Sequence, residues 1–466
     1  MNYNRIGSVD LAYFCKVLGD ERVLANEKIS EDFTHDELYN YNKYPDVVLH
    51  PKTTEEVSKI LKYANDKIIP VTCRGQGTGL VGSCVALFGG ILLDFSKMNK
   101  ILELDLENLT LTVEPGVLLM DINSYLASTG LFYPPDPGEK SATIGGNVNT
   151  NAGGMKAMKY GATKENILGL EIVFPDGIVD KTGGKIVKVS SGYNLQNLII
   201  GSEGTLAVVT KATLRLLPVP KYNVTLLVPF DALDDAIDAV PEIIKSKVML
   251  TAIEFAERDV ILSTEQYIGK KFPHNSASAY LILSFDGNTK QSLEEAYDEI
   301  AHKCIKAGAI DVFISNTPER NASIWTARGT FLEAIKSSTT ELDECDVVVP
   351  RNTIAKLIKF ANSLSEKYDV RIKSFGHAGD GNIHIYALKD NMKDEEWKKK
   401  LSLVFDELYL KTFEYGGAVS GEHGIGCMKK EYLARMLSRK SIEISKKIKD
   451  AFDPNNIMNP GKICCN

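Results

Sequence analysis

The stretch Ile68-Ile-Pro-Val-Thr-Cys-Arg-Gly-Gln-Gly-Thr-Gly-Leu-Val-Gly82 joins a short apolar run to a cluster of glycines. The apolar run predicts a buried strand, and the glycines that follow match the G-x-G-x-x-G nucleotide pattern. Only eight residues separate Gly82 from the next apolar run at Ile91, whereas the crossover of a parallel βαβ unit takes roughly a dozen residues, usually as a helix. Without that helix there is no helix N-terminus to receive a pyrophosphate. The spacing therefore argues against a Rossmann NAD site.

The glycine cluster can instead bind phosphate through its backbone. Gly75, Gly77 and Gly79 carry no side chains, which allows successive N–H groups to converge on an anion as a nest. Arg74 adds a positive charge at the edge of this loop. A plain turn is the alternative interpretation of the loop when it is taken alone.

Two further glycine-rich segments lie downstream. One is Thr143-Ile-Gly-Gly-Asn-Val-Asn-Thr-Asn-Ala-Gly-Gly154, within residues 134–162, which we expect to be loop throughout; the other is Gly201-Ser-Glu-Gly-Thr205. The small, apolar and amide residues of the first segment suit a close approach of the backbone to a flat, neutral ring. Three glycine loops in one strand-rich region indicate a large, extended ligand rather than a mononucleotide.

Two histidine-containing segments near the C-terminus predict a metal site. They are His377-Ala-Gly-Asp-Gly-Asn-Ile-His384 and Gly421-Glu-His-Gly424. Imidazole and carboxylate donors suit Zn²⁺, Fe²⁺ or Mn²⁺. Residues seven apart on one strand point to opposite faces, so a turn at 379–381 is needed for His377 and His384 to share an ion. Glu422 and His423 are adjacent, so we expect one to bind the metal and the other to face a substrate. Polar surface histidines in glycine-rich turns are the alternative.

Size and composition restrict the class of protein. A chain of 466 residues is too long for one ordinary core, which predicts two or three domains. The formal charge of −7, without a basic block, disfavours nucleic-acid binding. We see no signal segment and no apolar window of transmembrane length, so we expect a cytoplasmic protein. The eight cysteines form no CxxC motif, which favours free thiols, including those of Cys464 and Cys465 on the tail.

The pattern of elements changes after Pro220. From Tyr222 onward, apolar strands alternate with amphipathic helices, which predicts a second α+β domain. Helices are expected at 356–367, 395–414 and 442–452, with a strand near 383–387. We divide the chain into residues 1–41, 42–220, 221–415 and 416–466. The resemblance described next implies that these are an N-terminal segment, a cofactor domain, a substrate or cap domain with the metal site, and a C-terminal segment that completes the active site.

The ordered motifs resemble those of a known family. Pro70-x-x-x-Arg-Gly-Gln-Gly-Thr-Gly79, Thr143-Ile-Gly-Gly-Asn147 with Asn151-Ala-Gly-Gly154, and Gly201-Ser-Glu-Gly-Thr205 look like the FAD-binding loops of the vanillyl-alcohol oxidase/p-cresol methylhydroxylase (PCMH) superfamily. The histidine segments and Asn459-Pro-Gly-Lys462 are similar to those of the FAD-linked D-lactate dehydrogenase and glycolate oxidase family, which also includes D-2-hydroxyglutarate dehydrogenase. At 80–84 this chain reads Leu-Val-Gly-Ser-Cys, where the family commonly reads Leu-Ser-Gly-Gly-Ala.

The resemblance implies an α+β fold and a set of roles. It implies a two-subdomain PCMH-type FAD-binding domain, an α+β cap domain with an antiparallel sheet, and a C-terminal helical segment that returns to the flavin. His377, His384 and Glu422 would bind one divalent metal, and His423 would be the general base. Arg328, in Trp325-Thr-Ala-Arg328, would bind the substrate carboxylate, although read alone it is a surface cation. No histidine lies in the glycine loops, and Cys73 is not placed like a known tether, which favours non-covalent FAD. The residues implied to contact FAD are Arg74, Gly75, Gln76, Gly77, Thr78, Gly79, Pro137, Thr143, Gly145, Gly146, Asn147, Gly153, Gly154, Glu203, Gly204 and Asn459.

The implied reaction is oxidation of a small D-2-hydroxy acid, with D-lactate to pyruvate as the first choice and glycolate or D-2-hydroxyglutarate as alternatives. Hydride passes to flavin N5 while His423 takes the hydroxyl proton. Electrons then go to an external acceptor, either an electron-transferring flavoprotein or an iron–sulfur subunit, with a quinone as a further alternative. A zinc hydrolase without flavin, and a flavin subunit with a purely structural metal, are the competing hypotheses.

Overall fold

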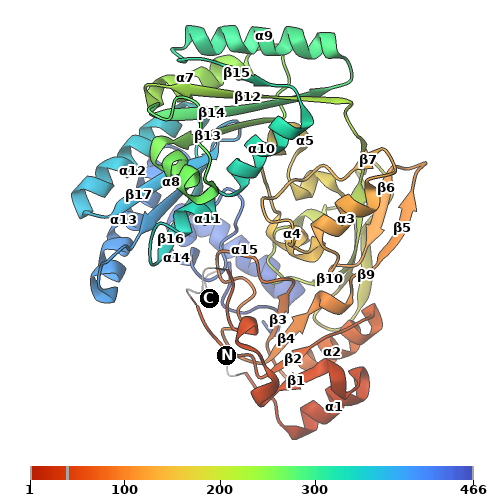
Figure 1. The fold of residues 1–466 in the computed structure, drawn as a ribbon. Helices are drawn as coiled ribbons and strands as arrows, with labels where there is room; N and C mark the ends of the chain where they lie inside the picture. Colours follow the sequence, from red (N-terminus) through yellow and green to blue (C-terminus); the bar gives the residue numbers. More distant parts are fainter. Residues whose placement is uncertain (1–2, 38–40, 464–466) are drawn as a thin grey trace. The chain divides into compact units, whose positions relative to one another are not determined.

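The computed structural model describes residues 3–37 and 41–463 and divides into two compact units. The first unit comprises Met1–Gly153, Gly161–Val219 and Glu422–Asn466, and the second comprises Gly154–Tyr160 and Pro220–Gly421. Figure 1 shows the first unit mainly in red to yellow, joined by the blue C-terminal segment, and the second mainly in green to light blue. Cys464 and Cys465 lie outside the described residues.

The first sheet of the first unit has the strand order β1-β2-β4-β3. Its strands are β1 (Val23–Ala25), β2 (Val47–Leu49), β4 (Ile91–Asp94) and β3 (Val71–Arg74). β3 and β4 run parallel, and the connection between them contains no helix, which agrees with the spacing argument against a Rossmann site. Helix α2 (Thr54–Asp66) buries Val57, Ile60 and Leu61 in the core of this sheet, to which α1 (Ser8–Leu18) also contributes.

The second sheet of the first unit is antiparallel, with the order β5-β6-β10-β8-β9. The strands are β5 (Ile101–Asp105), β6 (Thr110–Val113), β10 (Val208–Arg215), β8 (Ile167–Val173) and β9 (Val179–Gly183). A short pair, β7 (Leu131–Phe132) and β11 (Leu217–Pro218), completes the strands of this unit. Helices α3 (Leu119–Leu126) and α6 (Leu195–Ile199) each bury apolar side chains in the core of the sheet.

The prediction that residues 134–162 are loop throughout is wrong. Helix α4 (Ile144–Thr150) lies inside this range, and so does α5 (Ala157–Tyr160), which belongs to the second unit. The Thr143 hydroxyl caps α4 by accepting a hydrogen bond from the N–H of Gly146 at 3.1 Å. Ile144 and Val148 are fully buried. Tertiary packing therefore outweighs the poor helix propensity of two glycines and two asparagines.

The second unit contains a seven-stranded antiparallel sheet, as the resemblance implied. Its order is β15-β12-β14-β13-β17-β18-β16. The strands are β15 (Phe313–Ser315), β12 (Tyr222–Phe230), β14 (Ala279–Gly287), β13 (Ala252–Glu257), β17 (Arg371–His377), β18 (Asn382–Leu388) and β16 (Leu342–Val348). The helices are α7 (Leu233–Ile244), α8 (Arg258–Ile268), α9 (Lys290–Lys306), α10 (Pro318–Gly329), α11 (Phe331–Lys336), α12 (Ile354–Tyr368) and α13 (Asp394–Glu414).

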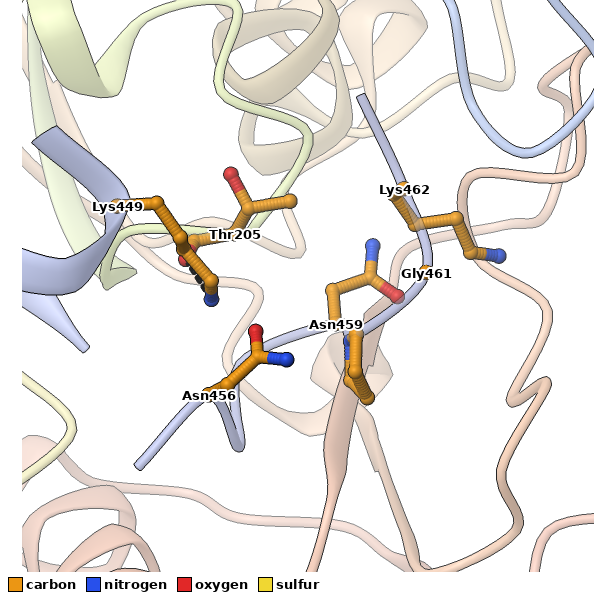
Figure 2. A pocket seen from close by; sticks show the side chains of 7 residues that line it. Thr205, Lys449, Asn456, Asn459, Gly461 and Lys462 are labelled. Carbon is orange, nitrogen blue, oxygen red and sulfur yellow. Dashed lines mark hydrogen bonds between the residues drawn. The ribbon is translucent and has the colours of Figure 1, made fainter. Parts of the chain in front are cut away.

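The C-terminal segment packs onto the glycine loops of the first unit. After α14 (Lys430–Met436) and α15 (Arg439–Phe452), the chain runs beside β3, where the N–H of Val71 donates to the carbonyl of Ile457 at 2.8 Å. Figure 2 shows Lys449 and Lys462 around a small cavity, with room for about one water molecule. The Lys449 ammonium donates to the carbonyl of Thr205 at 2.7 Å, and that of Lys462 donates to the carbonyl of Gly82 and, at 2.8 Å, to that of Val85. The tail therefore fixes two of the loops that the sequence assigns to the cofactor.

Within residues 3–37 and 41–463, no helix has both the length and the apolar character needed to cross a membrane.

Candidate flavin and metal sites

The first glycine loop presents a row of unused backbone donors. Within the described residues, none of the N–H groups of residues 75–79 donates a hydrogen bond. Gly77 has φ +77°, and a Cβ there would lie 2.0 Å from Nη2 of Arg74, so only glycine lets the guanidinium lie against the loop. Arg74 is held there because its Nη1 donates to the carbonyl of His35 at 2.7 Å. Free N–H groups beside a fixed cation are the features of an anion nest.

The second glycine loop contacts the first and carries a buried donor that has no partner. A Cβ on Gly75 would lie 2.2 Å from the hydroxyl oxygen of Thr143, and one on Gly145 would lie 2.9 Å from the carbonyl oxygen of Pro115. Asn147 is 3% exposed, and its Nδ2 has no hydrogen-bond partner among the described residues. Leaving such a donor unpaired costs free energy. The loop therefore fits a ligand that offers acceptor atoms, such as the ring carbonyls of a flavin.

The third glycine loop is tied to the second by a residue that sequence reasoning missed. The backbone carbonyl of Asn149 accepts from the N–H of Glu203 at 2.7 Å, and its side-chain oxygen accepts from the N–H of Gly204 at 3.1 Å. The alternation of asparagines at 147, 149 and 151 was the only signal in the sequence. Ser202, in the same loop, has a buried hydroxyl without a partner among the described residues.

The carboxylate of Glu203 fixes the turn that follows His423. It accepts hydrogen bonds from the Ser83 hydroxyl at 2.6 Å and from the N–H groups of Ile425 and Gly426, both at 2.7 Å. Burial raises the pKa of Glu203, although these hydrogen bonds oppose that shift. A Cβ on Gly424 would lie 2.7 Å from Glu203 Oε1, so the turn and the carboxylate fit closely. This contact positions the segment that carries the predicted base.

Three other predicted flavin contacts have different surroundings. Asn459 joins two loops, because its Nδ2 donates to the carbonyls of Ser83 at 2.8 Å and Glu203 at 2.7 Å. Pro137 is half-buried and accepts a hydrogen bond from Lys140 through its carbonyl. Gly154, with φ +130°, is the first residue of the strap 154–160 that belongs to the second unit.

The hairpin of β17 and β18 brings His377 and His384 together. β17 ends at His377 and β18 begins at Asn382, with a turn between them in which Gly381 has φ +83°. The two Nε2 atoms lie 3.4 Å apart, and both side chains are buried. The hairpin therefore provides the turn that His377 and His384 need if they are to bind one metal ion.

Each histidine is backed by a glutamate from a neighbouring strand. Nδ1 of His377 lies 2.7 Å from Glu254 Oε1 on β13, and Nδ1 of His384 lies 3.0 Å from Glu344 Oε1 on β16. With a hydrogen on each Nδ1, the two Nε2 lone pairs face one another. Two ligands at about 2.1 Å from a tetrahedral ion are about 3.4 Å apart, so the spacing fits a shared metal ion.

The same region of the second unit has an excess of buried negative charge. Glu254, Glu344 and Asp346 are all buried, and the buried guanidinium of Arg328 pairs with Glu254 at 2.6 Å. Burial alone would raise the pKa of Glu254, but its interactions with His377 and Arg328 outweigh burial and lower that pKa. Three carboxylates and one guanidinium leave an excess of negative charge that a divalent cation would balance. Sequence reasoning missed these acidic residues. The available signal was that they interrupt otherwise apolar strands.

Asp346 anchors the segment that leads to Glu422. Its carboxylate accepts from Asn382 Nδ2 at 2.7 Å, from the Ser420 hydroxyl at 2.8 Å and from the N–H of Gly421 at 3.1 Å. Gly421 is the last residue of the second unit, and Glu422 begins the next segment of the first unit.

The predicted roles of Glu422 as ligand and His423 as base stay predictions. Within the first unit, Glu422 Oε1 lies 3.5 Å from Nε2 of His423. A Cβ on Gly153 would lie 2.6 Å from Glu422 Oε2, so the second glycine loop contacts the side chain of the predicted ligand.

Comparisons with known proteins agree with the flavin features. A family described as "FAD binding domain" matches residues 45–183, and one described as "FAD linked oxidases, C-terminal domain" matches residues 219–463. A D-lactate dehydrogenase from Anaerostipes hadrus is 45% identical over 99% of this chain and 98% of its own length. Glycolate oxidase subunit GlcD from Bacillus subtilis is 40% identical over 92% of this chain and 91% of its own length. The crystal structure of p-cresol methylhydroxylase shares the fold with a TM-score of 0.82 at 20% identity, covering 97% of this chain and 96% of that one. The chain therefore belongs to the family of FAD-linked oxidases, with a PCMH-type fold, and is a flavin-dependent oxidoreductase.

Proposed function

We propose that the protein oxidises a D-2-hydroxy acid, with D-lactate to pyruvate as the first choice, using non-covalent FAD and one divalent metal ion. The observation that carries this proposal is the pair of buried histidines whose Nε2 atoms lie 3.4 Å apart, each backed by a glutamate. That arrangement suits a metal that orients the substrate hydroxyl. The family assignment argues against a zinc hydrolase, because the chain contains an FAD-binding domain and such a hydrolase would have none.

FAD would be held by the three glycine loops of the first unit. The free N–H groups of residues 75–79 and the charge of Arg74 suit the pyrophosphate, and the unpaired donor of Asn147 suits the ring. Bound FAD would supply the hydride acceptor at N5. Burial raises the pKa of the Cys73 thiol to about 12, which disfavours the thiolate that a covalent link would use and supports non-covalent binding.

The metal would be held by His377, His384 and Glu422, with Fe²⁺, Zn²⁺ and Mn²⁺ all compatible with this donor set. The hydrogen bond from Gly421 to Asp346 fixes the residue just before Glu422, and the next Cα lies only about 3.8 Å further on. Glu422 therefore follows a residue held by Asp346, and its role as the third ligand is proposed from the resemblance of Gly421-Glu-His-Gly424 to the family's metal motif. A bound divalent ion would lower the pKa of the substrate hydroxyl.

Two side chains would act directly on the substrate. His423 would accept the hydroxyl proton on an imidazole nitrogen, while the turn after it is fixed by Glu203. Arg328 would bind the carboxylate, since a guanidinium carries five N–H donors and the contacts with Glu254 use only Nε and Nη2.

The substrate and the acceptor follow from the relatives' names. The Anaerostipes hadrus relative supports D-lactate, and the Bacillus subtilis relative supports glycolate as a second candidate; D-2-hydroxyglutarate remains the third. We propose an electron-transferring flavoprotein or an iron–sulfur subunit as the acceptor, in line with the word "subunit" in the names of the GlcD relatives. A quinone is the alternative acceptor, and the cytoplasmic location stays a prediction.

The test is anaerobic reduction of the purified yellow protein. D-Lactate should bleach the flavin and L-lactate should not, and the same assay with glycolate and D-2-hydroxyglutarate ranks the three substrates. His423→Ala should keep flavin and metal but lose substrate reduction, while dithionite still reduces it. A flavin that no 2-hydroxy acid bleaches would mean a flavin subunit with a structural metal, and an active His423→Ala would overturn the role of the base.

A further inference from the structure

The two histidines of the second unit are supported by unlike partners. Behind His377 stands Glu254, which also pairs with the guanidinium of Arg328. Behind His384 stands Glu344, which also accepts a hydrogen bond from the phenol of Tyr386 at 2.8 Å. One support therefore contains a full positive charge and the other a neutral donor.

Arg328 is held in a single orientation. Its guanidinium carbon lies 5.2 Å from the ring centroid of Phe331 and 4.8 Å from that of Phe375, so the cation packs against two aromatic rings. Nε and Nη2 both contact Glu254 Oε2, at 2.7 and 2.6 Å. Residues on helices α10 and α11 and on strands β13 and β17 therefore meet around this ion pair.

The two oxygens of Glu254 have different partners. Oε2 faces Arg328, and Oε1 faces Nδ1 of His377 at 2.7 Å. Arg328 holds one oxygen and His377 contacts the other, which restricts rotation of the carboxylate, so Oε1 orients the imidazole. It also favours a hydrogen on Nδ1, which leaves the lone pair on Nε2 for a metal.

We propose that Arg328 and Glu254 form a positioning pair for the metal ligand His377, in addition to any contact Arg328 makes with substrate. This inference rests on the metal site of the proposed function. It assigns Arg328 an effect on metal affinity that exists without substrate, which a residue that only binds the substrate carboxylate would not have. Outer partners of metal-binding histidines typically change metal affinity about 10–100-fold when they are removed.

The test is a double-mutant cycle on the full-length, FAD-loaded protein after chelator treatment. Zn²⁺ is the probe, and a chromogenic chelator competes for it. Arg328→Met should weaken Zn²⁺ binding, because Glu254 then loses the contact that holds its carboxylate, and the loss of about 10–100-fold typical of a direct partner is its upper limit. Glu254→Gln removes the negative charge through which Arg328 acts on His377, so adding Arg328→Met to Glu254→Gln should weaken Zn²⁺ binding no further than Glu254→Gln does alone. Additive losses, or unchanged binding in Arg328→Met, would overturn the proposal.

Two controls separate this proposal from the proposed function. Lys373→Met removes a different buried cation, on β17, which donates to Ser263 and Ser338 rather than to Glu254, and should leave Zn²⁺ affinity unchanged. His384→Ala should abolish binding in the same assay. If His384→Ala binds Zn²⁺ as wild type does, the metal site itself is wrong. If His384→Ala loses Zn²⁺ while Arg328→Met raises only the KM for D-lactate, the metal site stands and the positioning pair is wrong.

Discussion

The two units prepare their sites in different ways. In the first unit the groups that would bind the cofactor are largely backbone N–H groups, which are free because glycines occupy the loops. The C-terminal tail fixes two of these loops. In the second unit the candidate metal ligands are histidine side chains. His377 is held in place because the strand register pairs it with Glu254 across β13 and β17. Ligand binding by the glycine loops should therefore weaken when a methyl group is added to a glycine. Metal binding in the second unit should weaken when a side chain is removed or altered.

The largest expected effect is the removal of a ligand in the second unit. His384→Ala should reduce the bound metal to below about a tenth of an ion per chain and lower kcat/KM at least about 10³-fold, because the ion loses one of its two buried imidazoles. His302→Ala, which alters an exposed histidine of the same unit, is the matched control. Metal analysis and steady-state kinetics with an artificial acceptor measure both effects. Full metal content in His384→Ala would show that His384 does not bind the metal, and the second unit would then not hold the ion in the way compared above.

A smaller effect concerns Glu257, a second-unit carboxyl that sits in β13 away from the histidines. Burial raises its pKa from 4.5 to about 7, although a hydrogen bond from Asn362 opposes the shift. Because the folded pKa lies above the unfolded one, the stabilising contribution is complete below about pH 4.5 and is lost as the pH rises through about 7. Glu203 in the first unit also has a raised pKa, but three hydrogen bonds to its carboxylate limit the shift.

Glu257→Gln tests this difference, because glutamine stays neutral at every pH. Relative to wild type, the variant should gain about 2 kcal/mol of stability between pH 5 and pH 8. Thermal unfolding midpoints at several pH values measure the gain, and Glu242→Gln at an exposed site is the control. A gap that does not change with pH would mean that Glu257 is already ionised at pH 5.

The next effect tests the backbone site of the first unit. Nothing lies within 4 Å of a Cβ built on Gly79, so Gly79→Ala should leave the fold and the unfolding midpoint of the FAD-free protein unchanged. If a pyrophosphate occupies the nest, the same methyl group should weaken FAD binding about 10–100-fold. Gly138→Ala has the same open surroundings outside the nest and is the matched control. Equal FAD affinity in both variants would show that residues 75–79 do not contact the cofactor.

Sequence reasoning reached the parts of each site that are local in the chain. The spacing of His377 and His384 required a turn at 379–381, and the hairpin of β17 and β18 has one. It missed Glu254 and Glu344, because register between strands far apart in sequence brings them to the histidines. Neither period-2 alternation nor composition reports such a register.

Two further differences have physical causes of the same kind. Helix α4 was missed because propensity is only a weak guide, and Ile144 and Val148 gain more from burial than the glycines and asparagines lose. Arg328 offered two interpretations in the sequence, a surface cation or a substrate ligand. Its pairing with Glu254 became visible only once β13 and α10 were placed in three dimensions.

The smallest expected effect lies where the glycine loops meet the predicted ligand. Gly153 has no left-handed backbone, so alanine is allowed there, but its Cβ would lie 2.6 Å from Glu422 Oε2. Gly153→Ala should therefore shift Glu422, weakening metal binding and lowering kcat roughly 5-fold, while FAD content stays at the wild-type level. Flavin absorbance, metal analysis and turnover with D-lactate separate these quantities. Loss of FAD with normal metal binding would reverse the interpretation, because the added methyl group would then act on the flavin loop itself and Glu422 would not depend on it.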